Sequence, residues 1–347
     1  MNFGKSVGSF FSLDIGTTAV RVVELAHSNS GWNLLHYGVK PIDVRLSEST
    51  AEADRRALGI AITDVINQSG IKSKKVAIGV PSNKMFASVV EIPTVSRQEM
   101  NATIKYQAEN YVPMRADEAK IDWAIIGQSV NDPQNTEVLI ASVQNSYTEA
   151  RLDLIEGLGL DVIAIEPDSL AIVRSLLPDG VQDGRMIIDM GDRYTDIILT
   201  VGSAPRLIRS VPIGLSTLVR MAKQNLNIEA QQARQLLLKF GLDPNNLEGQ
   251  IVHSVQPAVD QFKTELIKSL KYFTAKYTKT AVGGTLISGY TSVLKGFPDI
   301  IAATTNTQVQ MATPWQHVNV PAAAQASLAP ISSQLAVAVG LAERTGL

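Results

Sequence analysis

Short apolar runs alternate along the chain with segments in which apolar residues recur at helical spacing. Such alternation is typical of α/β architecture. Strands are predicted at 10–13, 19–26, 32–39, 75–81, 85–92, 138–143, 161–165, 186–189, 195–201, 205–211, 285–288 and 308–311. Helices are predicted at 50–69, 96–111, 146–158, 168–177, 214–225, 230–240, 255–277, 292–302 and 332–343.

Several of these helices carry additional signals. Gly70 stands where a C-cap glycine is expected, and Ser96 and Glu99 have the spacing of a capping box. The segment 86–159 predicts a β-α-β-α unit that forms its own subdomain. The last helix is rich in alanine, which favours close packing against another helix. The first predicted helix has an apolar face made of Ala57, Ile60, Ala61, Val65 and Ile66.

One strand-turn-strand pattern occurs twice. The first copy is Leu13-Asp14-Ile15-Gly16-Thr17, and the second is Ile188-Asp189-Met190-Gly191, followed by Thr195-Asp196. In each copy Asp-x-Gly ends an apolar strand. A duplicated two-lobe fold leaves such a repeat, so the sequence predicts two lobes with one copy in each.

The small and hydroxyl residues of these two turns suit phosphate binding. Gly16 and Gly191 would let backbone amides approach a phosphate without obstruction by a side chain. Hydroxyl donors would come from Thr17, Thr18 and Thr195.

The two aspartates of these turns predict a divalent cation. Carboxylates repel phosphates, and Mg²⁺ commonly binds one or two carboxylates together with phosphate oxygens. Asp14 and Asp189 would then clamp one Mg-nucleotide from two sides. Asp-x-Gly is also ordinary hairpin chemistry, but two copies in matching strand contexts favour the clamp. Arg21 could reach a phosphate, although a solvated arginine on a strand is the plainer interpretation.

Two further turns follow apolar strands. Glu166 precedes Pro167 at the start of a predicted helix, where a carboxylate is favourable on the helix dipole alone. Glu166 could instead face the Mg²⁺ shell or an attacking water, and both interpretations stay open. The turn Ser288-Gly289-Tyr290-Thr291 opens another helix and could pass under an adenosine.

The bulk composition narrows the classes of function. The 347 residues, 45% hydrophobic and 18% charged, predict a globular chain of two lobes or several subdomains. A net charge of −2 gives no electrostatic reason to expect nucleic acid. The absence of cysteine excludes disulfides and Cys-type zinc sites, and the four histidines lack metal spacing. The segment 300–342 has no charged residue, but prolines and amides interrupt it, so the chain is predicted to be soluble.

The order of these motifs resembles the actin, Hsp70 and sugar-kinase superfamily. The segments that resemble phosphate-1, the first connecting helix, phosphate-2, the adenosine motif and the second connecting helix are 10–25, 165–176, 187–200, 286–301 and 330–344. Within that superfamily the subdomain at 80–159 is similar to the FtsA and PilM branch. The strings that resemble the PilM family are Val80-Pro81, Ile92-Pro93, Tyr106-Gln107-Ala108-Glu109-Asn110-Tyr111-Val112-Pro113 and Ile165-Glu166-Pro167-Asp168-Ser169-Leu170-Ala171.

This resemblance implies a fold and a division of the chain. The fold class is α/β, an actin-like (ribonuclease H-like) two-lobe ATPase fold with an inserted subdomain of the FtsA and PilM type. The first lobe would hold 1–80, the inserted subdomain 81–160 and the connecting strand and helix 161–183. The second lobe would hold 184–329, and a C-terminal helix in 330–347 would return to the first lobe.

The resemblance also implies a role. Members of the family bind ATP in the interlobe cleft, with weak or disputed hydrolysis, and act as scaffolds of the type IV pilus machine at the cytoplasmic face of the inner membrane. They capture the N-terminal cytoplasmic peptide of PilN in a groove beside the extra subdomain. The implied metal ligands for Mg²⁺ are Asp14 and Asp189, and the implied catalytic residue is Glu166. The implied nucleotide-binding residues are Asp14, Gly16, Thr17, Thr18, Arg21, Asp189, Gly191, Thr195, Gly289, Tyr290 and Thr291.

The sequence departs from the superfamily pattern in the expected adenosine region. Tyr290 and Thr291 follow Gly289 where a run of glycines is usual, and Arg234 and Leu237 stand where Glu and Lys are usual. Two alternative functions therefore stay open. One is a small-molecule kinase, which needs a catalytic base near the γ-phosphate. The other is a pseudo-ATPase that acts only through protein contacts.

Overall fold

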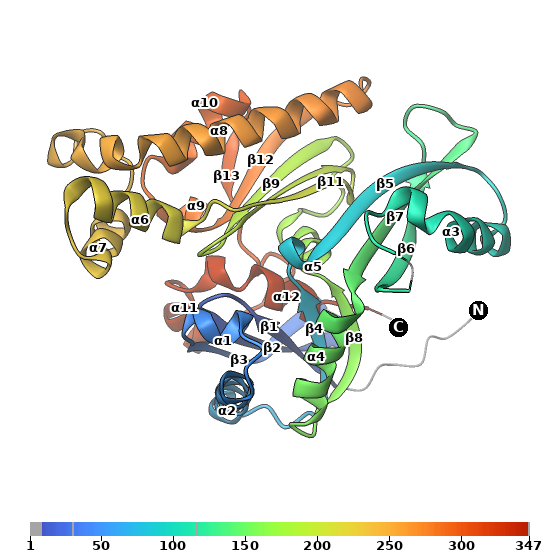
Figure 1. Ribbon diagram of the computed structural model, residues 1–347, viewed down its shortest axis with the longest axis horizontal. Coiled ribbons are helices and arrows are strands. Elements are labelled where there is room, and N and C mark those ends of the chain that lie inside the picture. Colours follow the sequence, from blue (N-terminus) through green and yellow to red (C-terminus); the bar gives the residue numbers. More distant parts are fainter. Residues whose placement is uncertain (1–8, 30, 116, 346–347) are drawn as a thin grey trace. The chain divides into compact units, whose positions relative to one another are not determined.

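The computed structural model of the chain describes residues 9–29, 31–115 and 117–345, with the backbone alone for 105–109. The chain divides into two compact units, and most of their elements are labelled in Figure 1. Unit 1 contains the described residues up to Pro81, Ser146–Leu177, and the described residues from Thr313 onward. Unit 2 contains Ser82–Asn145 and Pro178–Ala312.

Unit 1 is built on a six-stranded sheet. The strands are β1 Phe11–Ile15, β2 Ala19–Ser28, β3 Gly31–Pro41, β4 Lys75–Val80, β8 Asp161–Pro167 and β14 Val318–Asn319. Their order is β14-β3-β2-β1-β4-β8, in which β1, β2 and β3 form an antiparallel meander and β4 and β8 continue in parallel. The helices are α1 Val44–Glu48, α2 Glu52–Ser69, α4 Asn145–Glu156, α5 Asp168–Leu176, α11 Ala322–Leu328 and α12 Ala336–Ala342.

Unit 2 repeats this topology in its larger sheet. The strands are β9 Gly184–Met190, β10 Thr195–Val201, β11 Ala204–Val211, β12 Val282–Gly289 and β13 Val309–Met311. Their order β11-β10-β9-β12-β13 and their directions match those of β3-β2-β1-β4-β8. The helices are α6 Leu215–Leu226, α7 Ala230–Phe240, α8 Gln250–Lys276, α9 Tyr290–Val293 and α10 Phe297–Thr305. The two Asp-x-Gly hairpins therefore occupy equivalent places in two equivalent sheets, as the sequence repeat predicts.

The apolar periodicity of the helices explains how each sheet is covered. In unit 1, Leu58 and Ile62 of α2 pack in one cluster with Phe11 and Val20 of the first hairpin. In unit 2, the helices α6, α7, α8 and α10 pack in one cluster with β9, β10 and β12. The positive φ of 78° at Gly70 confirms the predicted C-cap of α2.

Unit 2 also contains a smaller three-stranded antiparallel sheet. Its strands, in the order β5-β7-β6, are β5 Met85–Pro93, β7 Asn135–Gln144 and β6 Ala119–Gln128, and its helix is α3 Arg97–Tyr111. The capping box is confirmed, because the Ser96 amide donates to Glu99 Oε2 at 2.9 Å and the Glu99 amide donates to Ser96 Oγ at 3.3 Å. Met100 and Ile104 of α3 are buried against β5 and β7. Side chains of the predicted Tyr106–Pro113 string up to Glu109 lie outside the described residues.

A buried ion pair joins this small sheet to the rest of unit 2. Glu137 of β7 is fully buried, and its Oε2 lies 2.6 Å from Nε of Arg206 on β11. The phenol of Tyr277 lies against the same carboxylate, and burial raises its pKa well above the ordinary value. At the end of α8, Lys276 Nζ donates to the carbonyl of Val89 at 2.9 Å. These contacts bind the small sheet to β11 and α8.

The structure departs from the sequence-based division in several places: Ser82–Asn145 is grouped with unit 2 rather than apart, and unit 2 resumes at Pro178 rather than at 184. Helix α4 was expected in the inserted subdomain, but its Ile155 is buried among residues of α2 and β4 in unit 1. The segment 313–329 was expected in the second lobe, but β14 pairs with β3 and Leu328 packs in unit 1. The structure also adds elements that the periodicity did not predict: α1, β6, β14 and α11.

Close contact between α5 and α12 confirms the expected packing of the alanine-rich helix. A side chain at Gly340 would collide with the backbone carbonyl of Ala171 on α5. Ala338 and Val339 are fully buried, in a cluster that also contains Val23 and Leu34.

Candidate functional site

In the first hairpin, Asp14 forms an ion pair with an arginine of the same hairpin. Asp14 is the last but one residue of β1, directly opposite Arg21 of β2, and Arg21 Nη1 donates to Asp14 Oδ2 at 3.0 Å. Both side chains are largely buried. Burial raises the pKa of Asp14, against the opposing attraction of Arg21. A Cβ at Gly16 would lie 2.5 Å from Arg21 Nη1, so glycine leaves room for the guanidinium at the tip of the hairpin.

The hairpin tip is itself held by the rest of unit 1. The amide of Gly16 donates to Ala19 O at 3.0 Å, which closes the turn. Thr18 accepts at its carbonyl from the amide of Ile42 at 2.9 Å, and Thr17 accepts from Ser47 Oγ at 3.3 Å. Both threonine side chains are partly exposed.

Helix α4 supplies neighbours of Asp14 that the sequence did not reveal. Tyr147 is half-buried, and desolvation raises the pKa of its phenol; Arg151 lowers that pKa, and the charges of Asp168 and Asp14 raise it. The Arg151 guanidinium lies 5.4 Å from the centre of the Tyr147 ring and donates to Ser47 O at 3.0 Å. No signal in a single sequence joins these residues, because they lie far from Asp14 along the chain.

The second hairpin presents two carboxylates where the first presents a carboxylate and a guanidinium. Asp189 of β9 pairs in register with Asp196 of β10, and residues directly opposite on antiparallel strands have Cβ atoms about 5 Å apart. Ser82 Oγ donates to Asp196 Oδ2 at 2.8 Å. Burial raises the pKa of Asp196, while the hydroxyls of Ser210 and Ser82 lower it.

The predicted glycine and threonine of this hairpin occupy different environments. Gly191 is exposed, and its amide closes the turn by donating to Tyr194 O at 2.8 Å. Thr195 is fully buried, and its Oγ1 donates to Ile213 O at 2.5 Å. The Thr195 hydroxyl therefore secures the hairpin to the segment before α6, whereas Gly191 stands at the surface.

The turn after β12 lies beside the second hairpin. Ser288 and Gly289 pair in register with Asp189 and Met190 of the parallel neighbour β9. Gly289 has φ 62°, and a Cβ there would collide with Met190 O, so this corner requires glycine.

The hydroxyl of Thr291 forms a hydrogen bond within this corner. Its Oγ1 donates to Ser288 O at 2.5 Å, and the residue is fully buried. The corner places Tyr290 at the carboxyl ends of β9 and β12, the edge of an open α/β sheet at which ligands commonly bind.

Arg234 bridges the second hairpin and this corner. Its Nη1 lies 2.9 Å from Oδ1 of the buried Asp192, and its Nη2 donates to the Tyr290 hydroxyl at 2.7 Å. Its guanidinium carbon lies 5.5 Å from the centre of the Tyr290 ring. The unusual residues Tyr290 and Arg234 therefore form one cluster with Asp192, a residue that the motif reading left out.

Glu166 is buried in an ion-pair network of unit 1. Its two oxygens accept from Arg174 at 2.6 and 3.0 Å, and Oε2 also accepts from Arg344 at 2.5 Å. Arg174 donates in addition to the carbonyl of Gly340. This network ties the end of β8 to α5 and α12.

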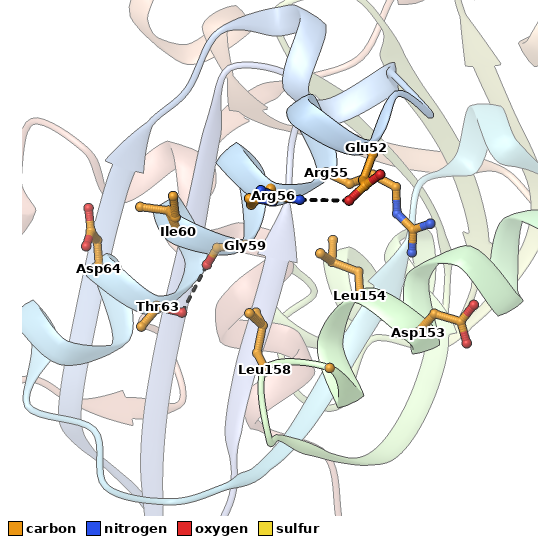
Figure 2. A pocket seen from close by; sticks show the side chains of 11 residues that line it. Glu52, Arg55, Arg56, Gly59, Ile60, Thr63, Asp64, Asp153, Leu154 and Leu158 are labelled. Atoms are coloured by element: carbon orange, nitrogen blue, oxygen red, sulfur yellow. Dashed lines mark hydrogen bonds and ion pairs between the residues drawn. The ribbon is translucent and has the colours of Figure 1, made fainter.

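A groove of about 610 Å³ lies in unit 1, between α2 and the region of α4. Figure 2 shows Gly59 facing Leu154 and Leu158, with charged side chains at the rim. Ile60, predicted on the buried face of α2, is 59% exposed and lines this groove. None of the predicted nucleotide-binding residues lines it.

Comparison with known proteins assigns the chain to a family. The family model described as type IV pilus assembly protein PilM matches residues 12–346. The chain belongs to this family. A solved structure described as the PilM–PilN type IV pilus biogenesis complex aligns with a TM-score of 0.83 and 20% identity, over 96% of this chain and 97% of that one.

More distant relatives share the fold. The ethanolamine utilization protein EutJ from Carboxydothermus hydrogenoformans aligns with a TM-score of 0.56 and 15% identity, over 98% of this chain and 91% of that one. MreB 5 of Spiroplasma citri bound to AMPPNP aligns with a TM-score of 0.55 and 12% identity, over 97% and 95%. The cell division protein FtsA of Enterococcus faecalis strain V583 is 23% identical over 218 residues, 54% of this chain and about half (48%) of FtsA.

These findings confirm the predicted actin-like ATPase fold and the predicted link to type IV pilus assembly. Within the described residues, no helix is long and apolar enough to cross a membrane. In the same part of the chain, no three His, Cys, Asp or Glu side chains gather as a metal site.

Proposed function

We propose that this chain is an actin-like scaffold of the type IV pilus machine that binds Mg-ATP and the N-terminal tail of PilN at the cytoplasmic face of the inner membrane. The likeness over nearly the whole chain to the PilM–PilN complex carries this proposal. The two topologically equivalent hairpins, each with Asp-x-Gly at its tip, support nucleotide binding. A protein of similar fold, MreB 5, is described as bound to AMPPNP.

Each unit contributes one phosphate-binding hairpin in this proposal. In unit 1, the backbone at Gly16 and the hydroxyls of Thr17 and Thr18 face a phosphate, and Arg21 supplies a cation at the same tip. In unit 2, the exposed Gly191 gives a phosphate access to the hairpin backbone. Thr195 contributes indirectly: its hydroxyl donates to Ile213 O and so holds the hairpin in place, rather than contacting a phosphate.

The nucleoside lies against the turn Gly289, Tyr290 and Thr291 in this proposal. Gly289 allows the close corner, and Thr291 fixes it through its buried hydroxyl. Tyr290 offers a ring for stacking that Arg234 already holds in place.

The carboxylates fit Mg²⁺ better in the second hairpin than in the first. Mg²⁺ keeps several waters and needs only one or two carboxylates beside phosphate oxygens, so a cluster of three acidic ligands is not required. Asp189 and Asp196 stand opposite each other and gain from a cation between them. Asp14 already has a cation in Arg21 and orients that side chain as well as facing the metal. When bound, Mg²⁺ supplies charge neutralisation for the phosphates.

The network around Glu166 supports a protein with weak or absent ATP hydrolysis. Both oxygens of the Glu166 carboxylate already accept from guanidinium groups, so neither is free to contact an attacking water. We propose that Glu166 positions β8, α5 and α12, and that any effect on hydrolysis is exerted through Arg174 and Arg344.

Calorimetry with the purified chain tests nucleotide binding. We expect saturable Mg-ATP binding that weakens in Asp14→Ala and Asp189→Ala without loss of the folded state. If no binding heat is detected at millimolar ATP, the pseudo-ATPase that acts only through protein contacts is favoured. If the purified chain phosphorylates members of a sugar panel, the small-molecule kinase is favoured. A matched control is Asp64→Ala, a half-buried acidic residue of α2 that is paired with Lys40 and belongs to neither hairpin turn.

The PilN tail is proposed to dock as an extended peptide beside α3. Because Ile104 is buried in the small sheet's core, its replacement would unfold that sheet rather than test a surface. Ala102 is exposed on the same helix, so Ala102→Arg is the sharper variant. We expect this variant to lose a fluorescently labelled PilN peptide in anisotropy titrations, with Mg-ATP affinity unchanged. Retained peptide affinity would place the tail elsewhere.

A further inference from the structure

The outer face of α8 concentrates basic charge on a chain that is acidic overall. Between 263 and 279 there are five lysines and one glutamate, a local charge of +4, whereas the whole chain carries −2. The remainder of the chain therefore carries −6. The one acidic side chain, Glu265, is turned inward, where it binds Arg209 of β11 at 2.7 Å and Lys268 at 2.8 Å.

Between 263 and 272, the lysines and the exposed apolar and aromatic side chains of this helix lie in two adjacent rows at a spacing of four. One row is Lys263, Ile267 and Lys271, and the next contains Lys268 and Tyr272. Ile267 is 40% and Tyr272 is 54% exposed. Each row therefore mixes a cation with an exposed apolar or aromatic side chain.

The lysines differ in how firmly they are held. Lys276 is engaged with Val89 O and lies over the Tyr277 ring, so it belongs to the packing of the small sheet. Lys263 lies 3.5 Å from Asp260. Lys271 and Lys279 are exposed, and no ion pair within the described chain occupies either of them.

We propose that this face of α8, made of Lys263, Ile267, Lys268, Lys271 and Tyr272, docks on an anionic phospholipid surface together with Lys279, which follows the helix. The lysines complement the negative surface potential of such a bilayer, and their stems are long enough to lie along it. Ile267 and Tyr272 enter the headgroup region, where an amphipathic aromatic ring is favoured. The positive charge alone would also suit an acidic peptide or an RNA. The exposed apolar and aromatic side chains between the lysines favour a lipid interface over both of these.

Co-sedimentation of the full chain with vesicles tests the proposal. We expect binding to phosphatidylcholine vesicles that contain phosphatidylglycerol, little binding to phosphatidylcholine alone, and weakening with added salt. Reversal of two charges in Lys268→Glu/Lys271→Glu lowers the partition coefficient by at least about tenfold, because each lysine near an anionic surface contributes roughly 1 kcal/mol. The control Lys72→Glu/Lys74→Glu changes the net charge equally on unit 1 and leaves partitioning within about twofold.

A second variant separates the surface from a general charge effect. Tyr272→Ser keeps every charge, and we expect it to reduce partitioning while the salt dependence persists. Equal binding to neutral and anionic vesicles, an unchanged partition coefficient in the double reversal, or tighter binding to RNA or polyglutamate than to anionic vesicles at the same ionic strength would overturn the proposal. The proposal does not rest on nucleotide binding, and calorimetry with Mg-ATP on the same variants shows whether the two properties separate.

Discussion

The two hairpins have the same sequence pattern and the same place in equivalent sheets, yet they differ in charge. In the first, Asp14 faces Arg21 across the strands, so the hairpin carries its own counterion. In the second, Asp189 faces Asp196, and the partners of the neighbouring acids come from elsewhere in unit 2, from Ser82 and Arg234. The duplicated fold thus keeps the backbone but changes the cross-strand pair, from a carboxylate and a guanidinium in the first hairpin to two carboxylates in the second.

The largest change in stability is expected from removing Arg21, the cation that pairs with Asp14 in the first hairpin. Arg21→Ala leaves Asp14 buried and unpaired, which costs about 3 kcal/mol of unfolding free energy at neutral pH. Because burial then raises the pKa of Asp14 further, the native state takes up a proton more readily than the unfolded one. The loss is therefore full above the native pKa and shrinks as the pH falls through it.

Denaturant unfolding at neutral and acidic pH measures this difference. Arg21→Lys retains a cation and serves as the matched control, with a smaller loss expected. A loss of equal size at both pH values would show that Arg21 acts through packing rather than through the charge of Asp14.

The next effect concerns the metal. Asp189→Asn removes one of two facing carboxylates, and we expect Mg-ATP affinity to fall by roughly tenfold or more, in line with the strength of charge-assisted contacts. Asp14→Asn leaves Arg21 free to contact phosphate, so a smaller loss is expected. ATP titrations of both variants with and without Mg²⁺ measure this difference. If Asp14→Asn abolishes the Mg²⁺ dependence of ATP affinity and Asp189→Asn preserves it, the proposed preference of Mg²⁺ for the second hairpin is wrong.

The smallest effect is a gain in stability. Burial raises the pKa of Asp196, so the ionised carboxylate is held at a cost above its native pKa. Asp196→Asn removes that cost and can still accept from Ser82, so the free protein becomes more stable at neutral pH. The gain disappears as acid protonates Asp196 in the wild type. Thermal unfolding without Mg²⁺ measures it, and a variant less stable than wild type at neutral pH would contradict this account.

Local sequence signals predicted much of the fold. The capping box at Ser96 and the C-cap at Gly70 concern residues close in sequence, and both are found as predicted. The repeated Asp-x-Gly pattern predicted two equivalent sheets, because a hairpin and its flanking strands are encoded in one short segment.

Features that depend on distant residues were missed or misplaced. Periodicity put Ile60 on the buried face of α2, but its side chain is 59% exposed, whereas the neighbouring Gly59 lies against Leu158. The resemblance placed Arg234 and Tyr290 in one expected adenosine region, but Asp192, which pairs with Arg234 there, was missed because it lies on a third, distant element.

The interleaved course of the chain has a consequence for synthesis. Unit 2 is complete once Ala312 has emerged, whereas unit 1 still lacks β14 and α12 at that point. The alanine-rich α12 packs against α5 and buries the underside of β1 and β2, strands made some three hundred residues earlier. During synthesis, the apolar face of the first hairpin that α12 covers therefore stays exposed until α12 has been made. The second hairpin can complete its packing earlier, because its unit ends at Ala312.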